Sequence, residues 1–343
     1  MSYRLPHILA VSLPLIGGVV MFGWRGAGVI ALVLGAGLVT SVLLCKVGRR
    51  GRHLQTTDVV WALLAVCLLL PAALASAAGL PWAIGIGALV TLAVWGFGGP
   101  ATSRVPIPAV AVLLVGIVQP SRLEQPAVLG AERPMVGDVL VFETTTPPER
   151  PWYRREMGTI AFEPPAVALQ KHTMGIVDPD LLLRDALPPF ADVVLGATPT
   201  ALGGSALLTL AALLLLAKTN RFDALLPMLA LCVAYVMLMA LPHAGNGWGL
   251  FASFGDGWLA GLTFVHYQLL SGPFLVTVAL LAAMPGIRPM SLQGRIVFAT
   301  ILGTLSAVLQ VYLSTSLGPL IALCGVALLT PVLDRHALPR PLL

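Results

Sequence analysis

The chain has 343 residues, of which 57% are hydrophobic and only 10% are charged, whereas a soluble domain carries roughly 25% charged residues. Apolar blocks recur along most of its length, each near the roughly 20 residues that cross the hydrocarbon core of a bilayer, and a soluble domain could not bury so many. The formal charge of +5 does not imply nucleic acid, because loop arginines that set membrane orientation account for it.

The apolar blocks predict an all-α polytopic membrane protein with about ten transmembrane helices. Backbone groups in lipid have to be hydrogen-bonded within their own segment, so each block is expected to be helical. The alternating ten-residue strands of a transmembrane barrel are not seen in the sequence. The predicted helices cover residues 7–23, 27–47, 58–77, 81–97, 105–118, 202–217, 222–241, 258–284, 296–313 and 316–333.

The distribution of Lys and Arg predicts the orientation of these spans. With the N-terminus in the cytoplasm, the short inside connections hold twelve basic residues, and the short outside connections hold only Arg25. This asymmetry follows the positive-inside rule and predicts that both termini are cytoplasmic. The inside residues are Arg4, Lys46, Arg49, Arg50, Arg52, Arg104, Lys218, Arg221, Arg288, Arg295, Arg335 and Arg340.

The same count bears on block 258–284, which is interrupted at Ser271-Gly272-Pro273. Two crossings here would move the four basic residues that follow to the outside, so one broken helix is favoured. A Gly-Pro break frees backbone groups and is tolerated where protein, cofactor or water satisfies them. A simple proline kink in a packed helix is the alternative.

These spans divide the chain into an N-terminal bundle of five helices at 1–118, an extracytoplasmic segment at 119–201 and a C-terminal bundle of five helices at 202–343. The long middle segment is rich in Pro and charge, and Gly137–Thr144 alternates like a strand. It is too long for a plain connector, which predicts a small ordered element outside the membrane. Leu181–Phe190 is expected to lie against the membrane surface.

Polar residues inside the spans are the candidates for an ion path or a cofactor contact. His266, Tyr267 and Gln268 lie within an apolar block, and such residues usually face the bundle interior. A polar cluster that only ties helices together is the alternative. His266, Gln268, Ser271 and Gly272 are therefore the predicted set. No metal-ligand spacing occurs, and the four cysteines lie in apolar blocks without CxxC spacing, which favours buried reduced thiols.

A glycine-containing turn runs from Asp192 to Ser205 and leads into an apolar helix. It places Thr198 beside a helix N-terminus, where free amides and the helix dipole favour a phosphate. The alternative is an ordinary N-terminal cap formed by Ser205 or Thr200.

Several short motifs in the two apolar bundles occur together. They are His266–Phe274, Gln293–Arg295, Thr330–Arg335, Pro339–Arg340, Phe22–Trp24, Thr57–Asp58 and Trp95–Gly99. In combination these motifs resemble the D subunit of Rnf-type electron-transport complexes, and they are similar also to the B subunit of the sodium-translocating quinone reductase. The resemblance covers most of the chain outside 119–180.

The resemblance implies a flavin-bearing subunit of the bacterial inner membrane, which works with other membrane subunits and is not an autonomous enzyme. Such complexes couple electron transfer of the ferredoxin–NAD type to Na⁺ or H⁺ translocation. In the family, FMN is esterified through its phosphate to a threonine in a motif resembling D-x-x-S/T-G-A-T. Asp192, Gly196, Ala197 and Thr198 match it, and Leu195 replaces the hydroxyl residue. Thr198 is thus the expected covalent acceptor, and a second, non-covalent flavin is consistent with the family.

The match leaves other functions open. Read on to Gly204, the same stretch resembles a separate family loop of the form G-N-x-P-G-S-x-G-E, which would move the flavin motif to Phe162–Lys171, with Pro165 at the threonine position. The usual T-D-P after the broken span is replaced by Ala283-Met284-Pro285. The alternatives are a structural subunit without covalent FMN and a secondary transporter or permease with no redox role.

Overall fold

A computed structural model describes residues 4–47, 56–71, 74, 79–99, 102–118, 169, 190–196, 201–219, 221–241, 258–270 and 272–337. The regular elements among them are helices, and one isolated antiparallel bridge pairs Pro71 with Ala201. Four helices are long and apolar enough to cross a membrane, or five when the bent pair is one span. The predicted class, an all-α polytopic membrane protein, is confirmed. The predictions for Gly137–Thr144 and 181–189 lie outside the described residues.

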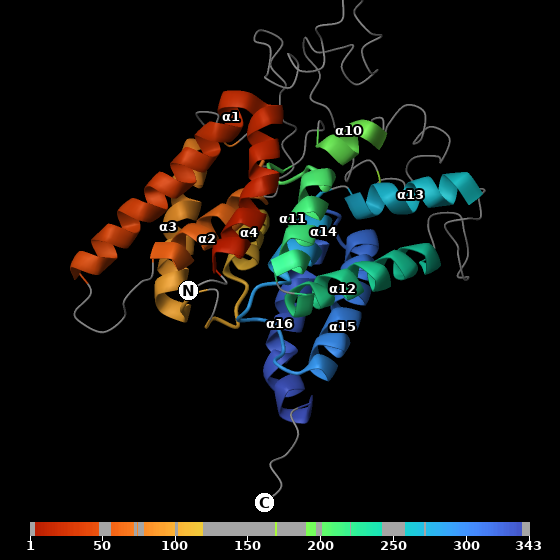
Figure 1. The fold of residues 1–343 in the computed structure, drawn as a ribbon. Coiled ribbons are helices and arrows are strands. Elements are labelled where there is room, and N and C mark those ends of the chain that lie inside the picture. The colour runs from red at the N-terminus through yellow and green to blue at the C-terminus, as the bar shows by residue number, and fades with distance from the viewer. Residues whose placement is uncertain are drawn as a thin grey trace, which may run out of the picture.

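The N-terminal half begins with α1 (Arg4–Val47), which is interrupted at Gly23 with φ 58° and ψ −139°. A straight helix of this length would extend about 66 Å, roughly twice the hydrocarbon core. Figure 1 shows that α1 instead forms two arms that meet at the top of the view. The arms approach closely, because a Cβ at Gly26 would lie 3.1 Å from the carbonyl oxygen of Gly18. The two predicted helices at 7–23 and 27–47 correspond to these arms.

Three shorter helices complete this half: α2 (Thr56–Cys67), α3 (Leu80–Phe97) and α4 (Ile107–Val118). The arms of α1 pack against α2 and α3. The helix predicted at 58–77 ends at Cys67, well before the predicted boundary. The chain leaves the helix within the continuously apolar stretch Leu68–Pro71, where hydropathy gives no sign of a break.

The C-terminal half contains a second set of helices. They are α11 (Ala206–Thr219), α12 (Arg221–Ala240), α13 (Trp258–Leu270), α14 (Phe274–Val276), the π-helix η4 (Thr277–Leu281), α15 (Leu292–Tyr312) and α16 (Gly318–Ala337). The break predicted in block 258–284 is present, and the helix axes on its two sides differ by 66°. Gly272 in the break has φ 68°, a left-handed conformation that glycine adopts readily.

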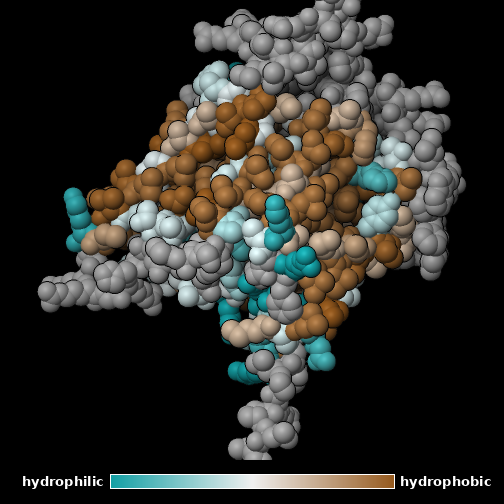
Figure 2. Space-filling view, viewed as in Figure 1, coloured by the Kyte–Doolittle hydropathy of each residue, from teal (hydrophilic) through white to brown (hydrophobic). Residues whose placement is uncertain are grey.

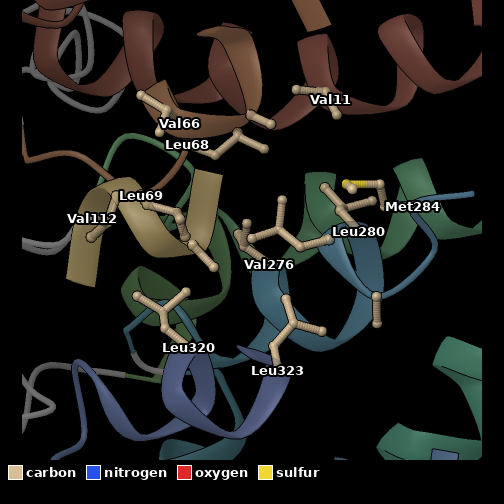
Figure 3. Close-up of a cluster of buried hydrophobic side chains, with 14 of the residues drawn as sticks. Val11, Val66, Leu68, Leu69, Val112, Val276, Leu280, Met284, Leu320 and Leu323 are labelled. Carbon is tan, nitrogen blue, oxygen red and sulfur yellow. The ribbon is translucent and has the colours of Figure 1, made fainter. Parts of the chain in front are cut away.

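The broken elements of both halves meet in one apolar core. Figure 3 shows Leu68 at the end of α2, Val276 and Leu280 on α14 and η4, and Leu320 on α16 within a single buried cluster. The halves also touch where α1 packs on α11 and where α4 packs on α16. In Figure 2 apolar side chains cover most of the described surface, and strongly hydrophilic ones gather mainly in the lower half and at the left edge. This outer surface suits a lipid environment.

Candidate flavin and ion site

The segment that carries the predicted flavin motif is packed between two helices of the C-terminal half. The short helix α10 (Phe190–Leu195) contacts α11 and α13, and Figure 1 shows it above both. Asp192 lies on α10, and Gly196 follows with φ 83°. A Cβ at Gly196 would lie 2.7 Å from the backbone nitrogen of Ser205, so the turn returns to the start of α11. Ala197 and Thr198 lie outside the described residues.

The start of α11 is capped and buried. The Ser205 hydroxyl accepts a hydrogen bond from the amide of Leu208 at 3.5 Å, and Ser205 is only 4% exposed. The alternative interpretation of Ser205 as an N-terminal cap is therefore confirmed. The amide of Leu208 is therefore not available to a phosphate.

The residues just before α11 are joined to the end of α2 by backbone hydrogen bonds. The amide of Leu202 donates to the carbonyl of Leu70, and the amide of Gly203 donates to the carbonyl of Leu68, each at 2.9 Å. A Cβ at Gly18 would overlap the carbonyl oxygen of Leu202, which leaves only glycine room at that position. We call this contact between 201–203 and 68–71 the α2 joint. It fixes the downstream end of the candidate flavin segment.

The polar trio on α13 does not face one direction, because residues two apart lie on opposite sides of a helix. Gln268 is fully buried toward α15, whereas His266 and Tyr267 face α10. The ring of Phe190 stands edge-on to His266 and Tyr267, with centroid distances of 6.0 and 5.8 Å, and Tyr235 packs on His266 at 5.7 Å. The four rings form an aromatic group beside α10.

The orientation of His266 follows from its hydrogen bond. Its Nδ1 lies 2.7 Å from the carbonyl oxygen of Leu262. Because a carbonyl oxygen only accepts, Nδ1 carries the proton, and in a neutral ring Nε2 is then the acceptor. A ring nitrogen of this kind is available to a bound planar cofactor.

Gln268 is paired with a residue that the sequence did not point to. Nε2 of Gln310 on α15 donates to the backbone carbonyl of Gln268 at 2.5 Å and to its Oε1 at 3.0 Å. Ser306, one turn earlier on α15, and Thr277, at the start of η4, are also fully buried. The polar pair Ser306 and Gln310, four residues apart in an apolar helix, was the available signal. Of the remaining candidates, Gly272 lies in the break and Ser271 is outside the described residues.

The sequence model of the NQR2, RnfD, RnfE family matches residues 2–342. The chain belongs to this family. Its members are membrane subunits of Rnf and Nqr ion-translocating complexes, and the resemblance seen in the motifs is confirmed. No curated protein matches the chain.

Within the NQR2, RnfD, RnfE family covalent FMN is known, and the described residues can be compared with that requirement. The small residue Gly196 and the adjacent aromatic group suit a tethered planar ring. Leu195 is 43% exposed on the last turn of α10, so this leucine does not fill a buried polar position. Within the motif the described residues end at Gly196, and the covalent flavin on this chain stays a prediction.

The four cysteines differ in exposure. All four cysteines are free, and the predicted burial holds for Cys67, whereas Cys45 and Cys232 are exposed on the outer surface, because apolar blocks in a membrane protein also face lipid. The described residues contain no group of three or more His, Cys, Asp or Glu that could hold a metal ion.

Proposed function

We propose that this member of the NQR2, RnfD, RnfE family is the D-type subunit of an Rnf complex that carries FMN on Thr198. In this role it helps couple electron transfer of the ferredoxin–NAD type to Na⁺ or H⁺ movement. One observation carries the proposal: α10 and the turn at Gly196 pack against α11 and α13. The residues that lead to Thr198 therefore lie beside the broken span.

The proposal includes ten crossings in a bacterial inner membrane, with both termini in the cytoplasm. The crossings are the two arms of α1, the helices α2, α3, α4, α11 and α12, the broken unit α13–η4, and the helices α15 and α16. In Figure 1 the apex of α1 and α10 lie at the top, α16 ends in the lower part, and the outer arm of α1 ends at the left edge, below the apex. Lys46 and Arg335 are near these two ends, and Arg25 follows the apex, which supports this orientation.

In the proposed site, the chain supplies binding and orientation, and a bound flavin supplies the electron chemistry. Thr198 holds the phosphate, and the aromatic group of Phe190, Tyr235, His266 and Tyr267 offers an apolar surface at the outer end of α13. Nε2 of His266 can accept a hydrogen bond from a ring edge. Among the described residues, this aromatic group is also the position that we propose for a second, non-covalent flavin.

Fluorescence of the denatured protein tests the covalent flavin. The chain is expressed in a bacterium that assembles Rnf complexes, purified with its partner subunits and run on a denaturing gel. We expect flavin fluorescence at the mass of this chain, retained in Thr200→Ala and abolished in Thr198→Ala. Thr200 is the matched control, because it is the same residue type two positions away.

Each other outcome rejects a defined part of the proposal. Fluorescence that persists in Thr198→Ala assigns the flavin to another residue. Wild-type protein without fluorescence that still purifies with the other Rnf subunits is the structural subunit lacking covalent FMN. A chain without flavin and without such partners is better explained as a transporter or permease.

A further inference from the structure

Several buried polar atoms of the C-terminal half have no hydrogen-bond partner. Within the described part of the chain they include Gln268 Nε2 on α13, Thr277 Oγ1 on η4, and Ser306 Oγ and Gln310 Oε1 on α15. All four side chains are 0% exposed. A buried polar atom of this kind is destabilising unless a ligand, ion or water satisfies it, and two of these residues, Gln268 and Gln310, are in direct contact, which points to a bound species at that contact.

Gln268 on α13 and Gln310 on α15 meet through their amide groups. The backbone oxygen and Oε1 of Gln268 both approach the amide group of Gln310, at 2.5 and 3.0 Å from Nε2. Ser306 lies four residues before Gln310, hence on the same face of α15. The NH₂ group of Gln310, with its partial positive charge, occupies the point on which the two Gln268 oxygens converge.

The burial of the site restricts its occupant. Gln268, Ser306 and Gln310 are fully buried, and Val265, Ala307 and Val311 on the same two helices are buried as well. A site without access to solvent suits a single ion or a water molecule.

The charge around the site favours a monovalent cation bound by neutral oxygens. In the sequence outside 119–201 the acidic residues are Asp58, Asp223, Asp256 and Asp334, and each lies within two residues of the end of a predicted span. None of them lies in the middle of a predicted span, where Gln268 is found. His266 faces α10, on the other side of α13 from Gln268.

The helix end adds to this preference. α13 ends at Leu270, and Pro273 has no amide to continue the hydrogen-bond pattern. The last carbonyls of α13 thus give the break a partial negative charge. Unwound carbonyls and half-helix C-termini of this kind coordinate Na⁺ in membrane transporters.

We infer that Gln268, Ser306 and Gln310 bind a Na⁺ ion at the C-terminal end of α13. The ion takes the place of the Gln310 NH₂ group between the two Gln268 oxygens, and a 180° rotation of the Gln310 amide presents Oε1 to it. The Ser306 hydroxyl supplies a further oxygen, and a water that accepts from Gln268 Nε2 completes the shell. A role of this ion in transport rests on the proposed function, whereas its binding does not.

Thermal unfolding of the purified full-length chain in detergent tests this site. Samples are compared in NaCl, KCl and choline chloride at equal concentration, and binding of ²²Na⁺ is measured in parallel. We expect Na⁺ alone to raise the Tm of the wild type, by about 2–4 °C. Gln310→Leu and Ser306→Ala should weaken Na⁺ binding about tenfold or more, while Gln310→Glu, which keeps the oxygens, should retain it.

Thr300→Ala is the matched control, because Thr300 is exposed on the same helix and its hydroxyl bonds only its own helix, at Ile296. Equal Tm values in NaCl and KCl, which mean that water alone fills the site, would overturn the inference. So would unchanged ²²Na⁺ binding by Gln310→Leu and Ser306→Ala. Flavin fluorescence on gels of the same samples keeps the two proposals apart, since loss of either property leaves the other measurable.

Discussion

The two halves of the molecule interrupt a helix at a similar place, but they treat the interruption in opposite ways. After α2, the freed carbonyls of Leu68 and Leu70 receive backbone amides from Gly203 and Leu202. Near the break after α13, by contrast, buried side-chain atoms of Gln268 and Thr277 have no partner. At the first interruption the freed carbonyls are hydrogen-bonded by another part of the chain, and at the second some buried polar side-chain atoms are not.

This difference indicates different roles for the two breaks. A break whose freed carbonyls are hydrogen-bonded, as at Leu68 and Leu70, stabilises one arrangement of the chain. A fixed anchor for the candidate flavin segment needs such an arrangement. An open break costs stability, and natural proteins tolerate such local violations mainly at functional sites. The α2 joint is thus structural, and the break after α13 is where binding is expected. Three predictions test this contrast, in order of decreasing effect.

The α2 joint should be the more sensitive of the two to added volume. In Gly18→Ala the new methyl group overlaps the carbonyl of Leu202, and the backbone there has no freedom to move aside. We expect a loss of about 1–3 kcal/mol, the usual cost of overpacking, seen as a lower Tm and less monodisperse protein in detergent.

Gly35→Ala is the matched control on the same helix. A Cβ at Gly35 meets nothing within 4 Å, so this substitution should be neutral or stabilise by up to about 1 kcal/mol through helix propensity. Equal Tm values for the two variants would show that the α2 joint is not a fixed contact.

The α2 joint also shows where sequence reasoning stops. Hydropathy located the helices, because the need to bond every backbone group in lipid makes apolar length informative. It extended α2 to residue 77, because Leu68, Leu69 and Leu70 look like more of the same helix. The partners that end this helix come from 201–203, over a hundred residues away, and no local pattern reports them.

The open break should respond differently to a single and a double substitution. Gln310→Leu leaves the oxygens of Gln268 buried without a donor, which costs about 1–3 kcal/mol. Gln268→Leu combined with Gln310→Leu removes Oε1 of Gln268 together with its donor and leaves only the backbone oxygen without one, so the double variant should be more stable than the sum of the single effects. Thermal unfolding in KCl measures this without any contribution from Na⁺.

A double variant as unstable as the sum of the single variants would mean that the two side chains are not coupled, which would contradict the buried pair. Recovery of stability with unchanged ²²Na⁺ binding would place the break after α13 in the same structural class as the α2 joint. Recovery of stability together with loss of ²²Na⁺ binding would set the two breaks apart.

Only half of this pair was predictable from the sequence. Gln268 was recognised because it stands in a polar trio beside a Gly-Pro break. Ser306 and Gln310 stand four residues apart in α15, which shows that they share a face of the helix but not that this face meets α13. The trio itself was expected to act together, but helical geometry sends Gln268 to α15 and His266 to α10. Thr198 stays a prediction, because it lies outside the described residues.

The smallest effect is expected at the upstream end of the candidate flavin segment, where side chains and not backbone bonds hold α10. Phe190 is 43% exposed, and its ring meets His266 and Tyr267 only edge-on. A double-mutant cycle of Phe190→Leu with Tyr267→Leu should give a coupling energy of about 0.5–1.5 kcal/mol. The same cycle with Phe97, an exposed ring on α3, in place of Phe190 should give none.

A coupling energy near zero for Phe190 and Tyr267 would mean that α10 is placed by the α2 joint alone. The coupling energy that we expect instead corresponds to a segment held firmly at its downstream end and loosely at its upstream end. Such a segment keeps its anchor fixed while α10 adjusts to α13. His266 and Gln268 are on the same helix, only two residues apart. A movement of α13 at the break would therefore also move His266 and change its contact with Phe190.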